Sequence, residues 1–168
     1  MRLVTIVRHA HAEKHDGDVE DFERRLDKRG RREAEHMAEL AHALGVRADH
    51  IVSSPAVRAI STAKEFARSL SFPLQKIRHD DRIYLAERAT LVGILRATPN
   101  AYRHVLICGH NPGISRLASW LADDETIGEL PTAALCTLKT SLDKWEAIGQ
   151  GSFEKVRLRW PDDGGPSR

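Results

Sequence analysis

The first apolar segment of the chain, RLVTIV at residues 2–7, is a nearly continuous run rich in β-branched residues. Such runs are typical of a central strand that is covered on both faces. Similar runs at 50–54 (HIVSS) and 104–108 (HVLIC) predict two further strands, and QKIRHD at 75–80 predicts a short one.

Apolar residues recur at helical spacing between and after these strands, which predicts helices. The apolar stripes of three predicted helices lie at residues 34–44, 60–70 and 114–121, and a fourth helix is expected from about 88 to 98. The basic segment at 24–33 is expected to be the solvated start of the first helix. Gly45 is expected to cap this first helix, and Pro55 is expected to open the second.

The last third of the chain is richer in strands. AALCTLK (133–139), KWEAIG (144–149) and KVRLRW (155–160) are each predicted to be a strand. Strands that alternate with helices and then give way to more strands predict an α/β three-layer sandwich. Its central sheet is expected to be mostly parallel with some antiparallel strands, and to carry helices on both faces. One domain is expected at 1–160, followed by a flexible tail at 161–168.

Composition is that of an ordinary soluble domain, with 168 residues, 41% hydrophobic and 30% charged. The formal net charge of +2 implies neither a nucleic-acid partner nor a membrane surface. Cys108 and Cys136 lie in apolar runs and are too few for a disulfide framework. No segment is apolar enough for a signal peptide or a membrane span, so a cytoplasmic protein is expected.

Polar residues follow three of the predicted strands. They are Arg8 and His9 after the first strand, Ser53, Ser54 and Arg58 after the second, and His110 and Asn111 after the third. In open α/β sheets, ligands bind beyond the carboxyl ends of the strands. We therefore expect the functional site where these three exits converge.

Two guanidiniums, two imidazoles and helix N-termini would fit a phosphoryl group. A neutral imidazole can attack phosphorus, and a second one can stabilise the oxygens. Each residue alone is weak support, because an isolated histidine or arginine at such a place is more often structural. The three exits together make a specific pattern.

Three segments resemble the histidine phosphatase superfamily, and within it the short SixA-like phosphohistidine phosphatases. They are RHAHA (8–12), SSPAVRAISTA (53–63) and VLICGHNPGISRLASWL (105–121). The resemblance covers nearly the whole chain and implies a phosphoglycerate mutase-like fold. The family motif is Arg-His-Gly, and Ala10 replaces the glycine here, which disfavours the mutase branch.

The resemblance implies a two-step phosphoryl transfer with no metal and no cofactor. His9 is the expected nucleophile, and water then hydrolyses the phosphohistidine enzyme. Arg8, Arg58 and His110 are expected to hold the three non-bridging oxygens. Further candidates for substrate binding are Arg24, which precedes a helix, Asn111, and His11, which either lines the mouth of the pocket or is simply solvated.

The expected substrate is phosphohistidine on a signalling protein, such as a histidine phosphotransfer domain or a phosphocarrier protein. Imidazole is a good leaving group that needs little help from an acid. A small phosphomonoester is the alternative, and it would call for a general acid. In the mutase-like branches of the superfamily, a carboxylate after the middle of the chain is this acid. The carboxylates in the corresponding stretch of this chain are Asp80, Asp81 and Glu87. Glu87 is better interpreted as a structural residue in the first turn of a helix.

Two other functions remain open from the sequence. His9 and His11 could bind a metal in a hydrolase, joined by His15, His79, Asp80 or Asp81. However, a (β/α)₈ barrel typically needs ~250 residues, and a metal site would leave Arg8 and Arg58 unexplained. A non-catalytic phosphohistidine-binding module could use the same pocket, although binding alone would not require two histidines.

Overall fold

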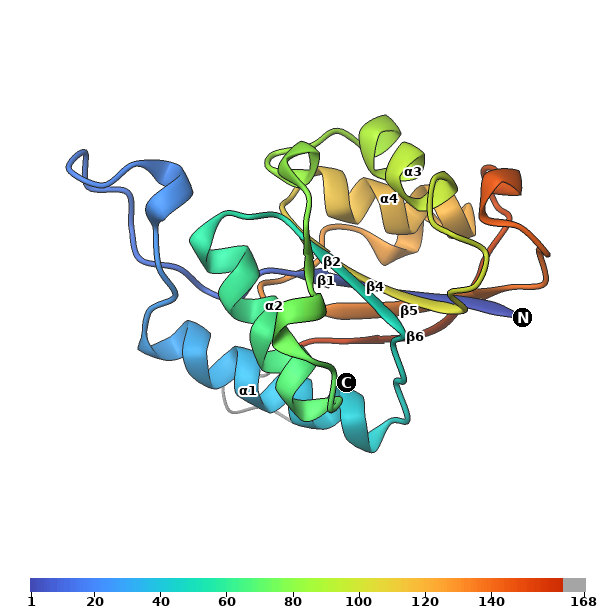
Figure 1. Cartoon of the computed structure of the whole chain (residues 1–168). Helices are drawn as coiled ribbons and strands as arrows, with labels where there is room; N and C mark the ends of the chain where they lie inside the picture. Colours follow the sequence, from blue (N-terminus) through green and yellow to red (C-terminus); the bar gives the residue numbers. More distant parts are fainter. Residues whose placement is uncertain (162–168) are drawn as a thin grey trace.

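Figure 1 shows the computed structural model of the chain, in which residues 1–161 are described. Its strands are β1 (Arg2–Arg8), β2 (His50–Ser53), β3 (Arg78–His79), β4 (His104–Gly109), β5 (Leu135–Thr140) and β6 (Glu154–Arg159). Its α-helices are α1 (Lys28–Ala43), α2 (Val57–Ser69), α3 (Arg88–Arg96) and α4 (Gly113–Ala122). The short 3₁₀ helices are η1 (Asp21–Glu23), η2 (Leu74–Lys76), η3 (Asp81–Ile83), η4 (Glu125–Ile127) and η5 (Trp145–Ala147). Apart from Pro161, the tail expected at 161–168 lies outside the described residues.

All six strands form one sheet in the order β3-β2-β4-β1-β5-β6. The first four strands in this order are parallel, whereas β5 and β6 are antiparallel to their neighbours. The predicted mixed sheet is therefore confirmed. β4 and β1 lie in the middle of the sheet, and their apolar sequences follow from being covered on both faces.

Helices cover both faces of the sheet, so the molecule has three layers (Figure 1). On one face, α1 and α2 bury a cluster that includes Met37, Phe66 and Leu106. On the other face, α3 and α4 bury a cluster that includes Ile107 and Leu117. Leu106 and Ile107 are neighbours on β4 that point to opposite faces, as successive residues of a strand must. The predicted three-layer α/β sandwich is confirmed.

The register of the parallel strands places the functional loops. Arg8 at the end of β1 pairs with Gly109 at the end of β4. The His9 amide donates a hydrogen bond of 3.1 Å to the Gly109 carbonyl, which continues this pairing. His9 and His110 consequently leave the sheet side by side. β2 flanks β4 on its other side and brings Ser54 to the same edge.

The strand predicted at 144–149 is wrong, because this segment forms the 3₁₀ helix η5. Its anchor is Trp145, which is fully buried. The Trp145 amide donates to the Asn100 side chain at 2.9 Å, and its indole N–H donates to the Tyr102 carbonyl at 2.9 Å. The apolar residues of this segment predicted a strand, but Trp145 is instead buried as a single aromatic anchor with its own hydrogen-bond partners.

Of the two helix boundaries expected from glycine and proline, one is wrong and one is confirmed. Pro55 does not open α2, which begins at Val57 with Ala56 as its N-cap. Gly45 directly follows the C-cap Leu44, has a φ of +81° and donates to the His42 carbonyl at 3.0 Å, so it closes α1 as expected. The strand predicted at 75–80 is limited to the two residues of β3.

Gly113, the first residue of α4, allows close packing beside the strand exits. A Cβ atom at this position would lie 2.0 Å from the Ala86 carbonyl oxygen, in the segment that enters α3. The start of α4 therefore packs directly against backbone. Gly93 in α3 offers a contrast, because a Cβ atom there would meet nothing within 4 Å.

We expect Gly113→Ala to lower the free energy of unfolding by about 2 kcal/mol or more, because backbone must move to admit the methyl group. Gly93→Ala should instead raise it by about 0.5–1 kcal/mol, because alanine favours an exposed helix interior. Urea denaturation of both variants measures these changes. Equal effects of the two substitutions would contradict this account of the packing.

Candidate active site

A cavity of about 410 Å³ lies where the strand exits meet. Its lining residues are Arg8, His9, His11, Ala12, Asp21, Arg24, Arg58, Leu85, His110, Asn111 and Thr132. All seven candidate residues from the sequence are among them. The other four lining residues, which the sequence analysis did not identify as candidates, are Ala12, Asp21, Leu85 and Thr132.

His9 is held by its own loop. Its Nδ1–H donates to the Ala10 carbonyl at 2.8 Å, which leaves the Nε2 lone pair as the free nucleophilic position. Burial lowers the pKa of His9 to about 4, and the nearby guanidiniums of Arg58, Arg8 and Arg24 act in the same direction. The imidazole is therefore neutral at physiological pH, as a nucleophile must be.

His110 lies beside His9, with 5.3 Å between the ring centroids. Its Nε2 is 2.7 Å from the Ser54 hydroxyl, and that hydroxyl already accepts from the Ala56 amide at 3.2 Å. Ser54 keeps its hydrogen free to donate to Nε2, and in that arrangement the ring proton of His110 lies on Nδ1. Burial lowers the pKa of His110 to about 3, and His9 and Arg58 contribute to the shift.

Arg58 is buried at the start of α2 and is oriented by Asp21. Its guanidinium donates to the Asp21 carbonyl at 2.7 Å and to the Asp21 carboxylate at 3.0 Å. The same carboxylate accepts from Arg24 at 3.0 Å and from the Tyr84 hydroxyl at 2.5 Å. Burial raises the pKa of Asp21, but these hydrogen bonds and the Arg58 charge outweigh it and hold that pKa far below its usual range.

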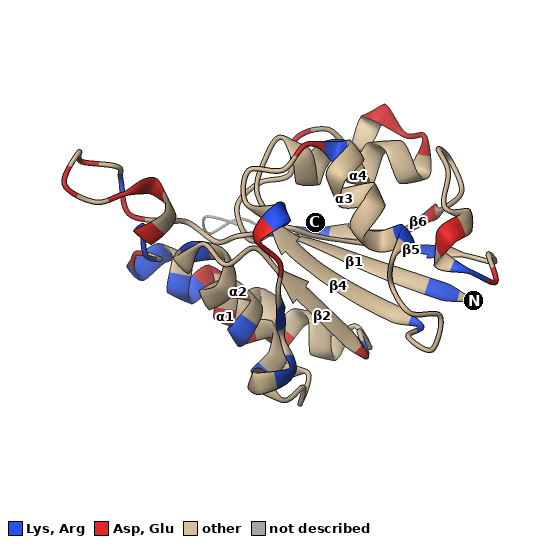
Figure 2. Ribbon diagram, turned by 45° about the horizontal axis from the view of Figure 1, so that its top comes forward, with Lys and Arg blue, Asp and Glu red and all other residues tan. Residues whose placement is uncertain are grey.

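Asp21 lies in η1, on the long loop between β1 and α1. Figure 2 shows this loop extending away from the sheet with several acidic residues on it. Asp21 is the one whose carboxylate returns to the cavity. Nothing in the local sequence distinguished it from its acidic neighbours, because its partners Arg58 and Tyr84 come from distant segments.

A buried hydroxyl joins the loops that carry His9 and Arg58. Thr62 accepts from the Ala10 amide at 3.0 Å and donates to the Arg58 carbonyl at 2.8 Å. Ala10 is also the residue whose carbonyl holds His9. Thr62 thus fixes the nucleophile loop against the first turn of α2.

Arg8 completes the cationic side of the cavity. Its guanidinium donates to the Leu130 carbonyl at 2.9 Å. Burial lowers the pKa of Arg8, while the charges of Glu129 and Glu33 raise it.

Unsatisfied polar atoms gather in this cavity. Within residues 1–161, the buried side-chain nitrogens and oxygens with no hydrogen-bond partner are Arg8 Nε, Arg58 Nε and His110 Nδ1. Buried polar groups are nearly always paired, so these exceptions mark a place where hydrogen-bonding capacity is left for a ligand. All three belong to the residues predicted to hold a phosphoryl group.

The remaining candidates occupy the edge of the cavity. His11 is hydrogen-bonded to Asp27, and Arg24 bridges Asp21 and the Glu13 carbonyl. Both polar ends of the Asn111 side chain are engaged, since it donates to the Leu130 carbonyl and accepts from Ser115. Asn111 therefore shapes the wall, and its side chain has less capacity to bind a ligand than the sequence suggested.

None of the three acid candidates lines the cavity. Asp80 is buried against Arg82, whose hydrogen bonds are the main cause of its lowered pKa. Asp81 is exposed, and Glu87 borders a separate groove. Among residues 1–161, no group of three or more His, Cys, Asp or Glu side chains is arranged to hold a metal ion.

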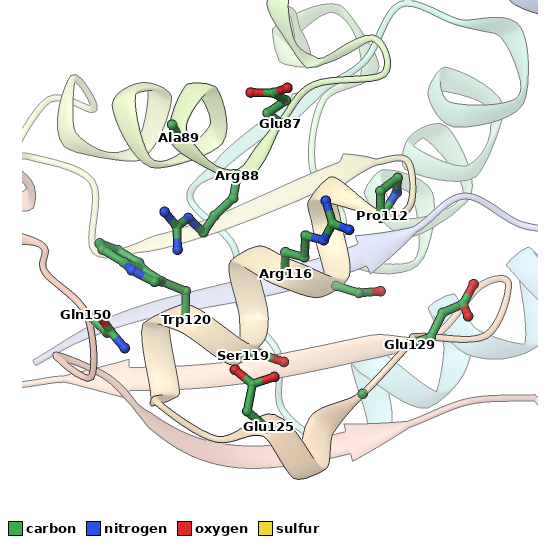
Figure 3. A pocket seen from close by; sticks show the side chains of 12 residues that line it. Glu87, Arg88, Ala89, Pro112, Arg116, Ser119, Trp120, Glu125, Glu129 and Gln150 are labelled. Carbon is green, nitrogen blue, oxygen red and sulfur yellow. The ribbon is translucent and has the colours of Figure 1, made fainter.

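Figure 3 shows a second and larger groove, of about 830 Å³. Asn111 lines the cavity, and the next residue, Pro112, lines the groove. The groove carries charges of both signs. The Arg88 guanidinium lies over the Trp120 ring, with 5.1 Å between its central carbon and the ring centroid. No histidine lines this groove, so the candidate nucleophile and its partners lie in the smaller cavity.

Known structures share this fold over almost the whole chain. A protein assigned as the phosphohistidine phosphatase SixA from Agrobacterium tumefaciens is 25% identical, with a TM-score of 0.82 and coverage of 96% of this chain and 99% of that one. The protein histidine phosphatase SixA solved with tungstate is 23% identical, with a TM-score of 0.78 and coverage of 93% and 95%. A mycobacterial glucosyl-3-phosphoglycerate phosphatase is 17% identical, with a TM-score of 0.67 and coverage of 92% and 97%.

No curated protein matches the sequence of this chain. The family model of the histidine phosphatase superfamily (branch 1) matches residues 4–88, which is half of the chain and includes Arg8, His9 and Arg58. With this match and the shared fold, the chain belongs to the histidine phosphatase superfamily.

Proposed function

We propose that the protein is a phosphatase that works through a phosphohistidine intermediate on His9. The observation that carries this proposal is the set of unsatisfied nitrogens on Arg8, Arg58 and His110 around one neutral imidazole. A phosphoryl group would supply the negative charge and the acceptor oxygens that these residues lack.

In the first step, His9 Nε2 attacks phosphorus and the bond from phosphorus to the leaving group breaks. Arg8, Arg58 and the Nδ1–H of His110 stabilise the charge on the non-bridging oxygens. In the second step, water attacks phosphorus, the bond to Nε2 breaks, and inorganic phosphate leaves. The guanidiniums supply the charge that a metal ion would otherwise provide, so we propose that no metal or cofactor takes part.

We further propose that the substrate is phosphohistidine on a protein. None of the carboxylates proposed as acids reaches the cavity, which suits a leaving group that departs without strong acid help. Leu85 lines the cavity and is 57% exposed, so it offers an apolar contact to a protein partner at the edge of the proposed phosphoryl site. Glu87, two residues after Leu85, lines the neighbouring groove, and this groove extends the surface available to a partner.

The proposed partner is a histidine phosphotransfer or phosphocarrier domain of a signalling system. A cytoplasmic location is part of the proposal, because Cys108 and Cys136 are free and buried. Within residues 1–161, no helix combines the length and apolar character needed to cross a membrane.

We expect His9→Ala to reduce turnover by about 10³-fold or more, because the nucleophile is lost while the fold is kept. Wild-type protein mixed with phosphoramidate and rapidly quenched should carry a phosphoryl group that survives base and is lost in acid. His36→Ala, an exposed position on α1, is the control and should behave as wild type. An acid-stable phosphoenzyme, or near wild-type turnover of His9→Ala, would refute the assignment.

The acid titration of His9 should have its midpoint near pH 4, because burial and nearby cations disfavour the imidazolium. The unfolded chain takes up this proton at about pH 6.5, so the free energy of unfolding should fall as pH drops from about 6.5 towards about 4. NMR titration of the ring protons measures the midpoint. In Arg58→Ala it should move to higher pH, and a wild-type midpoint near 6.5 would contradict the electrostatic account.

Phosphohistidine on a phosphotransfer domain and phosphoramidate should be hydrolysed far faster than alkyl phosphates, with or without a chelator. Leu85→Ser should lower kcat/KM for the protein relative to phosphoramidate by about 10-fold, the worth of one buried leucine contact. Val156→Ser, an exposed apolar position on the edge strand β6, is the control. A preference for alkyl phosphates that is lost in Glu87→Gln would instead support a small-molecule phosphomonoesterase.

A further inference from the structure

His11 and Asp27 form a close pair at the edge of the active-site cavity. The Nδ1–H of His11 donates to the Asp27 carboxylate at 2.5 Å. The His11 ring lines the cavity and its side chain remains 37% exposed. With Nδ1 engaged, Nε2 is the ring nitrogen left for the cavity and for solvent.

The backbone around this pair is held rigidly against the start of α1. Asp27 is the N-cap of α1 and accepts from the Gly30 amide at 2.7 Å. Its own amide donates to the His11 carbonyl at 3.3 Å. A Cβ atom on Gly30 would lie 1.8 Å from that carbonyl oxygen, so glycine is required for the loop to approach α1 this closely. The His11 amide in turn donates to the buried Glu33 carboxylate at 3.1 Å.

The other titratable groups that line the cavity are poorly suited to accept a proton near neutral pH. The pKa of His110 is lowered to about 3, and its ring is committed to Ser54. Asp21 has a strongly lowered pKa and is occupied by Arg58, Arg24 and Tyr84. His9 is itself the group from which phosphorus must depart.

We propose that His11, oriented by Asp27, is the general base for hydrolysis of the phosphohistidine enzyme. This inference rests on the proposed function of His9. Water attacks phosphorus while its proton passes to Nε2 of His11, and the bond between phosphorus and His9 Nε2 breaks. Asp27 stabilises the imidazolium that forms, and His11 then releases the proton to solvent.

Charged groups of both signs lie around His11. The Asp27 carboxylate accepts from the His11 ring, and the Glu33 carboxylate accepts from the His11 backbone amide. The guanidiniums of Arg8, Arg24 and Arg58 line the same cavity.

The test separates formation of the phosphoenzyme from its decay, with phosphoramidate as the phosphoryl donor in rapid-quench experiments. In His11→Gln the phosphoenzyme should form as in wild type but decay about 10²-fold more slowly, so that it accumulates. The wild-type decay rate should rise with pH as the general base loses its proton, whereas the profile of His11→Gln should be flat. His36→Gln carries the same substitution at an exposed position and should match wild type.

Asp27→Asn provides an independent variant, because asparagine is also a good N-cap and α1 should be preserved. Its decay rate should fall, because the imidazolium formed on His11 loses the carboxylate that stabilises it. Wild-type decay with an unchanged pH profile in His11→Gln would overturn the inference, and so would loss of phosphoenzyme formation in that variant. If wild-type protein formed no phosphoenzyme on His9, the proposed function itself would fail.

Discussion

The parallel pairing of β1 with β4 is the constraint on which the site depends. This pairing sets Arg8 opposite Gly109 at the ends of the two strands. A histidine follows each of them, so the rings of His9 and His110 lie side by side. A slip of one residue would turn every side chain of β1 to the opposite face and bury polar groups in the wrong layer. Two apolar cores, one on each face of the sheet, oppose such a slip. The energy that fixes the fold therefore also fixes the site.

Burial and positive charge act together on the two histidines. Desolvation is the largest cause of the lowered pKa of both rings, and the guanidiniums add to it. The outcome is a pair of neutral imidazoles inside a cationic cavity, where an anion is attracted and the nucleophile keeps its lone pair. Asp21 limits the charge imbalance, because its carboxylate holds Arg58 and Arg24 in place.

The cavity divides its functions among structural layers. The sheet edge supplies Arg8, His9 and His110, and the first turn of α2 supplies Arg58. The loop before α1 supplies Asp21 and Arg24, and the N-cap of α1 holds His11 through Asp27. In the proposed reaction, the rigid sheet thus positions the phosphoryl group, while residues anchored to α1 handle the proton.

The sequence by itself determined the sandwich fold and seven of the residues that line the cavity, because β-branched runs mark central strands and strand exits mark ligand sites. It did not determine the conformation of 144–149, where burial of Trp145 through Asn100 and Tyr102 overrides the local pattern. Nor could it assign Asp21 to Arg58 or Ser54 to His110, or exclude Glu87 from the cavity. These pairs join residues far apart in the chain. Only the packing of helices and loops around the sheet brings such groups within hydrogen-bond distance, and local periodicity carries no record of that packing.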